Sequence, residues 1–335
     1  MSEDMDFTIP PEEIDAPVRR RFPVALQLTV LGLLLAVIFS GTYIPYLLAK
    51  KEAAATQPAP AAPLIIADTT TTTTSTLDTI TIDATAAYVY DVQTKRALYN
   101  KNADKVLPLA SITKLMTALL AHELVDSDKA VTVPKAAILQ SGASGLAEGE
   151  TFTSQALADY AVLASSNDAA FALAAAVGAI INPTNPNQTF ISAMNIRADE
   201  LGLPNLTFYN PTGLDISTTE PGAVGSAREI SFLMEYILTN YPSILEPTTF
   251  TSTRIYNEAG TYHEAENTNP IITRIPNVLG SKTGYTDLAG GNLTIAFDAG
   301  YNRPIIVTVL GSSYDGRFAD VVKLVAAVTA SLAQE

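Results

Sequence analysis

Residues Leu109–Thr117 read LASITKLMT and place a serine and a lysine three positions apart, Ser111 and Lys114. Side chains three residues apart share one face of a helix, so a helix over Ser111–Leu124 would hold the amine beside the hydroxyl. Serine is a weak nucleophile until a base removes its proton, and lysine can be that base only when it is neutral. Burial and a second nearby cation would lower the lysine pKa as this role requires. The spacing also arises by chance, so the motif alone does not decide the chemistry.

Two further short motifs lie downstream, each on an element that suits it. Ser165–Asn167 (SSN) separates two Ala-rich segments that predict helices, Ser154–Ala164 and Asp168–Ile180. Lys282–Gly284 (KTG) ends a predicted strand, Val278–Thr283. Taken singly, the first could be a pair of helix caps and the second a strand end with a turn glycine. Their occurrence in order with the Ser-x-x-Lys motif favours one shared site.

The remaining pattern predicts strands at both ends of a domain with helices between them. Such an order indicates an α+β fold in which the last strands complete one sheet. The other elements expected are a hairpin of Ala86–Val92 and Arg96–Tyr99, helices Asn187–Leu201, Ser226–Asn240 and Arg317–Ala333, and strands Gly291–Asp298 and Pro304–Gly311.

The N-terminal quarter of the chain differs from the rest in composition. Residues 23–49 carry no charge and are long enough to cross a hydrocarbon core of about 30 Å, which predicts a single transmembrane anchor. Residues 1–22 carry three consecutive arginines, Arg19–Arg21, just before this segment. We therefore expect a cytoplasmic tail and a cell-membrane protein whose following domain is extracytoplasmic. Residues 50–83 are rich in Pro, Ala and Thr and predict a linker, which leaves 84–335 as the catalytic domain.

Composition narrows the chemistry of that domain. The net charge is −14, with no basic stripe, which argues against a nucleic-acid partner. There are no cysteines, which excludes disulfides and thiolate metal sites. With only two histidines, His122 and His263, a Ser–His–Asp triad or a multi-histidine zinc site is not favoured. A hydrolytic site would use a different base, and neither a metal nor an organic cofactor is expected.

The three motifs together resemble those of penicillin-binding proteins and serine β-lactamases. The flanking sequence is more similar to the low-molecular-mass, DacA-like D-alanyl-D-alanine carboxypeptidases, a family of serine peptidases. Four further blocks carry this likeness, which extends over about residues 84–330: Ala164–Ala170 (ASSNDAA), Phe208–Asp215 (FYNPTGLD), Asn267–Asn269 (NTN) and Gly280–Gly290 (GSKTGYTDLAG).

The resemblance implies a transpeptidase-like α/β sandwich: an antiparallel sheet flanked by helices, with an inserted all-helical lobe. It also implies removal of the terminal D-Ala from peptidoglycan stem peptides that end in D-Ala-D-Ala, and sensitivity to β-lactam antibiotics. In this scheme Ser111 attacks the carbonyl of the penultimate D-alanine and Lys114 is the general base. Ser165 and Asn167 relay protons and hold the substrate amide.

The substrate-binding residues implied by the resemblance follow the third motif. Lys282 supplies positive potential, Thr283 binds the terminal carboxylate, and Gly284 completes the triplet. The backbone N–H groups of Ser111 and Tyr285 hold the oxyanion. Arg317, at the end of Gly311–Arg317 (GSSYDGR), is expected to bind the free carboxylate. Its guanidinium is suited to this role because it can form two parallel hydrogen bonds with a carboxylate.

One departure and three alternatives accompany this interpretation. Ser166 stands where the family commonly has glycine, and its hydroxyl could alter the pocket. A D,D-endopeptidase or a β-lactamase would use the same three motifs, and a non-catalytic wall-binding protein could share the fold. Glu264 and Glu266 could activate a deacylating water as in some β-lactamases, although solvated loop carboxylates are the simpler interpretation.

Overall fold

The computed structural model describes residues 77, 80–142 and 145–333. Contacts within the chain place all described residues in one compact unit. The predicted tail, the predicted transmembrane anchor at residues 23–49 and most of the predicted linker lie outside the described residues. Among the residues that are described, no helix combines the length and apolar character needed to span a membrane.

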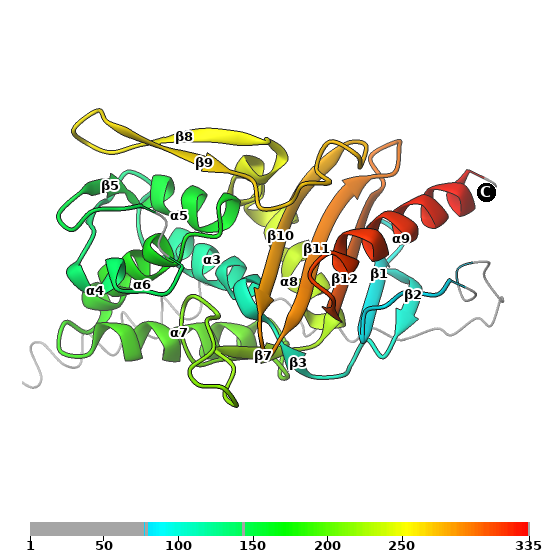
Figure 1. The fold of residues 1–335 in the computed structure, drawn as a ribbon, viewed down its shortest axis with the longest axis horizontal. Coiled ribbons are helices and arrows are strands. Elements are labelled where there is room, and N and C mark those ends of the chain that lie inside the picture. The colour runs from blue at the N-terminus through cyan, green and yellow to red at the C-terminus, as the bar shows by residue number, and fades with distance from the viewer. Residues whose placement is uncertain (1–76, 78–79, 143–144, 334–335) are drawn as a thin grey trace, which may run out of the picture. The chain divides into compact units, whose positions relative to one another are not determined.

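A five-stranded sheet forms the centre of the described unit (Figure 1). Its strands run in the order β10-β11-β12-β1-β2, and every neighbouring pair is antiparallel, which confirms the predicted sheet. The predicted hairpin near residue 90 forms its far edge. The strands are β1 (Ala86–Asp91), β2 (Arg96–Lys101), β10 (Val278–Thr286), β11 (Gly290–Asp298) and β12 (Pro304–Ser312).

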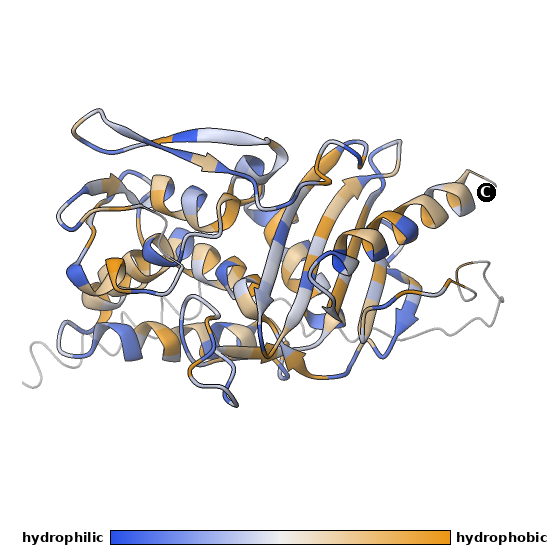
Figure 2. Ribbon diagram, in the orientation of Figure 1, coloured by the Kyte–Doolittle hydropathy of each residue, from blue (hydrophilic) through white to orange (hydrophobic). Residues whose placement is uncertain are grey.

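Two helices cover opposite faces of this sheet. α8 (Ala227–Asn240) packs on the face that carries Tyr88 and Tyr90 of β1, whereas α9 (Gly316–Leu332) packs on the face that carries Val89. Neighbouring residues of a strand point to opposite faces, so β1 and β12 can be apolar over most of their length and contribute to both cores. Figure 2 shows the same concentration of hydrophobic residues on the inner strands.

A mainly helical lobe is inserted between β2 and β10, where the resemblance implied an all-helical one. It also contains a small two-stranded sheet of β4 (Ala130–Thr132) and β5 (Thr151–Thr153). Its longer helices match the predicted segments to within a few residues, except that a 3₁₀ turn precedes the helix predicted to begin at Ser111. The short helix α4 was not predicted. The lobe contains η3 (Ala110–Thr113), α3 (Lys114–Leu124), α4 (Lys135–Ile138), α5 (Ser154–Leu163), α6 (Asn167–Ile181) and α7 (Pro186–Glu200).

Several short elements were not expected from the sequence. A hairpin of β8 (Ser252–Tyr256) and β9 (Tyr262–Glu266) lies along α5 and buries Ile255 and Ala265 (Figure 1). The 3₁₀ turn η5 (Glu246–Thr249) packs against β10 just before this hairpin. The remainder are β3 (Leu107–Pro108), β4 (Ala130–Thr132), β5 (Thr151–Thr153), β6 (Thr207–Phe208), β7 (Ala223–Gly225) and η4 (Pro242–Ile244).

Residues at the end of the predicted linker pack against the domain. Leu77 and Ile82 are buried in the core beneath α9. The carboxylate of Asp320, on α9, accepts hydrogen bonds from the backbone N–H groups of Asp83 and Ala84 at 3.0 and 2.8 Å. These contacts hold the start of β1 against the C-terminal helix.

Candidate active site

The segment carrying Ser111 has an unusual backbone. Ala110 has a φ of +49°, a left-handed conformation that costs a non-glycine residue free energy and recurs at functional sites. The following residues form the 3₁₀ turn η3, in which the Thr113 hydroxyl donates to the Ala110 carbonyl at 2.7 Å. Ser111 therefore lies in a tight turn three residues before Lys114, which is the first residue of α3.

Lys114 is completely buried and its amine contacts three oxygen atoms. Nζ lies 2.8 Å from Ser111 Oγ, 2.7 Å from Asn167 Oδ1 and 2.7 Å from the Thr212 carbonyl oxygen. A neutral amine has two protons to donate and one lone pair, and among these three partners only the serine hydroxyl has a proton to give in return. Burial lowers the pKa of Lys114 well below its usual value, and the nearby Lys282 lowers it further. The contacts therefore suit a base that receives the Ser111 proton.

The middle motif connects the helical lobe to both lysines. Asn167 begins α6, and while its Oδ1 accepts from Lys114, its Nδ2 donates to the Ser141 carbonyl at 2.7 Å. Ser165 has a φ of +58°, and its hydroxyl lies 3.0 Å from Lys282 Nζ. Ser166 points elsewhere: its buried hydroxyl caps α6 by accepting from the Ala169 N–H at 3.0 Å.

The third motif lies inside β10 rather than at the end of a strand, because the strand continues to Thr286. Lys282 is fully buried, and its amine donates to Ser165 Oγ and to the Thr283 carbonyl. Burial, with a smaller contribution from the Arg317 charge, lowers the pKa of Lys282 to about 7. The Thr283 hydroxyl lies 2.6 Å from that of Thr268, in the NTN block.

Gly284 brings β10 into close contact with the Ser111 turn. A Cβ at this position would lie 2.8 Å from the Leu109 carbonyl oxygen and 3.2 Å from the Ser111 nitrogen, so only glycine fits here without a shift. Tyr285 is the next residue, and the two backbone N–H groups expected to hold an oxyanion thus belong to segments in contact. Arg317 approaches from α9 and donates from Nη1 to the Gly284 carbonyl at 2.6 Å.

Two groups that shape this site were not predicted from the sequence, the side chain of Asn292 and the carbonyl of Thr212. Asn292, on β11, is fully buried and donates to the Pro108 and Leu109 carbonyls while accepting from the Gly311 N–H. It therefore ties β11 and β12 to the chain just before Ser111. The Thr212 carbonyl was missed because a backbone group has no signature of its own, although the FYNPTGLD block marked its position.

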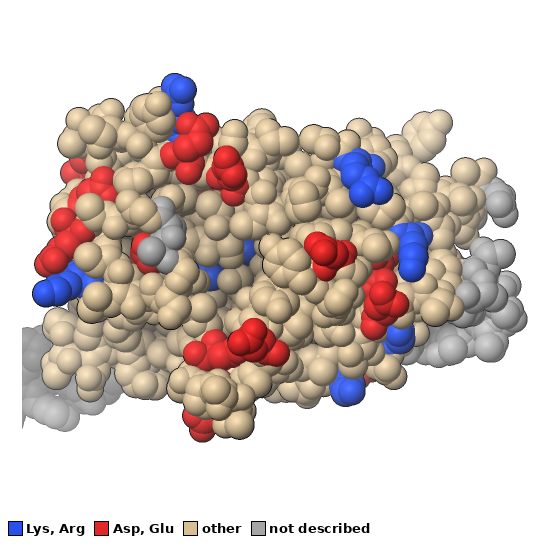
Figure 3. Space-filling model, in the orientation of Figure 1, with Lys and Arg blue, Asp and Glu red and all other residues tan. Residues whose placement is uncertain are grey.

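The site has basic side chains at its bottom and acidic residues on the surrounding surface. Figure 3 shows a hollow between the helical lobe and the sheet, with basic atoms at its bottom and acidic residues around it. Lys114, Lys282 and Arg317 are buried and form no ion pair with a carboxylate among the described residues. Positive potential beneath a recess suits a substrate with a free carboxylate.

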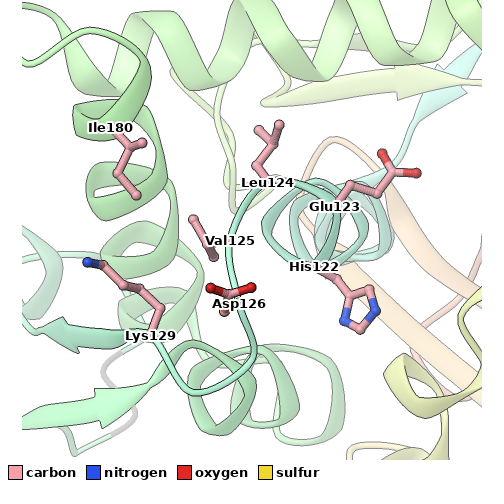
Figure 4. Close-up of a pocket in the computed structure, with 7 residues that line it drawn as sticks. All are labelled: His122, Glu123, Leu124, Val125, Asp126, Lys129 and Ile180. Carbon is pink, nitrogen blue, oxygen red and sulfur yellow. The ribbon is translucent and has the colours of Figure 1, made fainter. Parts of the chain in front are cut away.

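The two histidines lie outside this constellation. His122 borders a separate shallow hollow at the end of α3, where its ring and the Glu123 carboxylate point away from Asp126 and Lys129 (Figure 4). His263 lies on β9, and its Nε2 is 2.9 Å from the carboxylate of Glu150. Within the described ranges no grouping of His, Asp and Glu could hold a metal ion.

The fold is that of the penicillin-binding proteins. The ampicillin-bound structure of a penicillin-binding protein from Listeria monocytogenes superposes with a TM-score of 0.63 at 29% sequence identity, covering 74% of this chain and 98% of that one. This likeness confirms the transpeptidase-like architecture of the described unit.

Sequence comparison identifies the family. The model of the D-alanyl-D-alanine carboxypeptidase family matches residues 69–313, and the chain belongs to this family. It is 34% identical to the D-alanyl-D-alanine carboxypeptidase DacF of Bacillus subtilis over 72% of this chain and 61% of that protein. It is also 28% identical to a D-alanyl-D-alanine endopeptidase of Pseudomonas aeruginosa over 71% of this chain and 75% of that protein. The chain thus spans about three-fifths of the length of DacF.

Proposed function

We propose that this chain is a serine-type D-alanyl-D-alanine carboxypeptidase, which removes the terminal D-Ala from peptidoglycan stem peptides through an ester on Ser111. The contacts of Lys114 carry this proposal. The buried amine donates to two oxygen atoms that can only accept, those of the Asn167 side chain and the Thr212 carbonyl. When the amine is neutral, its lone pair therefore faces the third partner, the Ser111 hydroxyl. Membership of the family supports the choice of substrate.

The first half of the reaction acylates the serine. Ser111 Oγ attacks the carbonyl carbon of the penultimate D-Ala while its proton passes to Lys114. The backbone N–H groups of Ser111 and Tyr285 hold the oxyanion of the tetrahedral intermediate. The C–N bond then breaks as Lys114 passes the proton it took from Ser111 to the departing D-Ala nitrogen, by way of Ser165, which hydrogen-bonds Lys282. Lys114 is then neutral again. Free D-Ala and a seryl ester result.

The second half restores the enzyme. A water molecule gives a proton to Lys114 and attacks the ester carbonyl, and the intermediate collapses with return of a proton to Ser111 Oγ. Thr283 and Arg317 bind the substrate carboxylate during the first half, and Asn167 holds the substrate amide. A β-lactam acylates Ser111 in the same way, but its amine stays attached to the acyl group.

Residues 23–49 anchor this enzyme in the cell membrane in our proposal, with residues 1–22 in the cytoplasm. The uncharged length of the segment and the three preceding arginines support this arrangement. The domain from about residue 84 would then act in the cell wall, with residues 50–83 as the spacer, although the contacts of Leu77 and Ile82 shorten its free length. Fractionation of cells that express the full chain, with protease added from outside, tests this placement.

A D,D-endopeptidase is the second candidate, because a relative of comparable similarity carries that name. The two activities differ in the leaving group rather than in the nucleophile. We favour the carboxypeptidase because Arg317 and Thr283 border the site where a free terminal carboxylate would bind.

The decisive experiment measures D-alanine release from a peptide ending in D-Ala-D-Ala by the full chain in detergent micelles. Ser111→Ala and Lys114→Met are assayed in parallel, with circular dichroism as a check of folding. We expect both variants to lose at least about 10³-fold in rate, since nucleophile and base act as a unit. A folded wild-type chain that releases no D-alanine would contradict the proposal.

A further inference from the structure

Two tyrosine rings stand beside the guanidinium of Arg317. The rings of Tyr285 and Tyr314 meet edge to face with centroids 5.0 Å apart, and about half of each side chain is exposed. The guanidinium lies 5.9 Å from the first ring centroid and 4.6 Å from the second, and 4.6 Å from that of Phe318. Arg317 itself is 4% exposed, and its Nε has no hydrogen-bond partner within the described structure. The guanidinium is therefore enclosed by aromatic rings and donates to the backbone of β10.

The position of these rings on the sheet relates them to the carboxylate site. Alternate side chains of a strand share a face, so Thr283 and Tyr285 point to the same side of β10, the side opposite to Lys282. Arg317 reaches the carbonyl of Gly284, which lies between them. A carboxylate held by Thr283 and Arg317 therefore lies directly beside the Tyr285 ring, with Tyr314 continuing the surface.

The same rings have little freedom to move away. An edge-to-face contact between aromatic rings is favourable beyond the area it buries, and a cation over an aromatic face adds a further attraction. Both interactions are present here, and the cation is held in turn by its bond to β10. The pair is thus a fixed wall rather than two independent surface side chains.

We infer that the Tyr285–Tyr314 pair is the wall of the pocket for the leaving residue, and that it selects a terminal residue with a small side chain. The inference rests on the proposed function and deepens it. In any α-amino acid the side chain and the carboxylate are attached to the same Cα. Fixing the carboxylate against Thr283 and Arg317 therefore brings the side chain of the leaving residue to the wall. The methyl group of D-Ala fits this space, whereas a longer chain meets the rings.

This wall separates the two activities proposed for the site. The leaving group of a cross-linked stem peptide is a residue whose side chain continues into a second peptide, whereas that of a free stem peptide is D-Ala. A rigid ring at the side-chain position excludes the first and accepts the second. The pair therefore determines specificity without touching the reacting carbonyl.

The test compares two peptides that differ only in the last side chain, one ending in D-Ala-D-Ala and the other in D-Ala-D-norleucine. The full-length wild type, Tyr285→Ala, Tyr314→Ala and the double variant are assayed for release of the terminal residue. We expect the wild type to favour D-Ala in kcat/KM by at least about tenfold, which is the scale of discrimination by apolar pockets. The double variant should lose most of that preference through a higher kcat/KM for the norleucine peptide.

Matched variants separate a wall from a general disturbance. Tyr285→Phe and Tyr314→Phe keep the rings and should keep the preference, and so should Tyr256→Ala, which removes an exposed tyrosine from the β8–β9 hairpin. A wild type without preference, or a double variant with an unchanged ratio, would overturn the inference while leaving the carboxypeptidase intact. If the folded wild type released neither residue, the proposed function would fail and the inference with it.

Discussion

Ser166 shows how one hydroxyl beside a reactive site can serve structure rather than chemistry. Its neighbours Ser165 and Asn167 contact Lys282 and Lys114, but the Ser166 side chain points into the start of α6 and accepts from the Ala169 N–H. The first N–H groups of a helix have no partner within the helix, so a side-chain oxygen at this position stabilises it. The serine in the centre of the motif is thus explained by helix capping.

Replacing Ser166 by alanine should therefore lower the free energy of unfolding by about 1 kcal/mol, whereas glycine should cost only a few tenths. Urea unfolding of the three proteins measures this difference. The rate of acylation by a fluorescent penicillin should stay within about twofold of the wild type, because the hydroxyl does not face the lysines. Unchanged stability together with a large loss of acylation would instead assign Ser166 to the pocket.

At the scale of elements, the β8–β9 hairpin is connected through one carboxylate to the loop that precedes β5. Glu150, just before β5, accepts from the Ala147 N–H at 2.7 Å, from Asn257 Nδ2 at 3.1 Å, and lies 2.9 Å from His263 Nε2. The loop between α4 and Glu150 also supplies the Ser141 carbonyl that orients Asn167. The hairpin was not predicted from the sequence. Through Glu150 it contacts the same loop whose Ser141 carbonyl binds Asn167 of the middle motif.

These contacts make the stability of the hairpin depend on pH. Burial opposes the charge of Glu150, but the Ala147 N–H, His263 and Asn257 outweigh it and hold the pKa of this carboxyl below its usual 4.5. A carboxyl with a lowered folded pKa contributes stability above its unfolded pKa and loses it as pH falls through the folded value. Glu150→Gln should therefore cost about 1 kcal/mol at pH 6–7, and the deficit should shrink below pH 4.5.

Urea unfolding between pH 3.5 and 7 measures this deficit. Glu264→Gln is the matched control, because Glu264 is exposed and lies 3.8 Å from an exposed Arg254, a pair of little expected value. A deficit of Glu150→Gln that does not change with pH would assign the loss to shape rather than to charge.

The elements that the sequence predicted are those whose pattern repeats within a few residues. The β1–β2 hairpin and the helices α5 and α8 follow from alternation or a 3.6-residue period. β8 and β9 were missed because their outer faces carry Arg254, Tyr256, Tyr262 and two glutamates, which obscure the two buried apolar positions.

The sequence predicted the motif residues of the site, but not the residues that hold them in position. Ser111 and Lys114 are brought together as their three-residue spacing predicted, although through a 3₁₀ turn, and Asn167 joins them as the resemblance implied. Asn292 acts on a segment more than 180 residues away, and the positive φ of Ala110 depends on the packing of Gly213 against it. No local pattern encodes such contacts, because they exist only once the sheet and the lobe have packed.

At the scale of the whole molecule, the fold keeps two lysines in its interior without a carboxylate partner among the described residues. Lys114 and Lys282 are both fully buried between the helical lobe and the sheet, and the nearby Arg317 adds a third positive charge. A buried cation without a counter-ion is costly, and the group either stays charged at that cost or gives up its proton. The reactive arrangement therefore lowers the stability of the folded state, and this cost depends on pH.

The sign of the dependence follows from Lys282. Its pKa is about 7 in the folded state against 10.5 when unfolded, so between these values the unfolded chain binds more protons than the folded one. The free energy of unfolding should therefore rise from pH 7 to pH 10, and Lys114, whose pKa is also lowered, acts in the same direction.

Lys282→Met should be more stable than the wild type at pH 7, and its free energy of unfolding should rise less with pH. Urea unfolding of the full chain at pH 7, 8.5 and 10 measures both, with the exposed Lys105→Met as control. Equal slopes for the wild type and Lys282→Met would show that this lysine keeps an ordinary pKa, and the electrostatic account of the site would then rest on Lys114 and Arg317 alone.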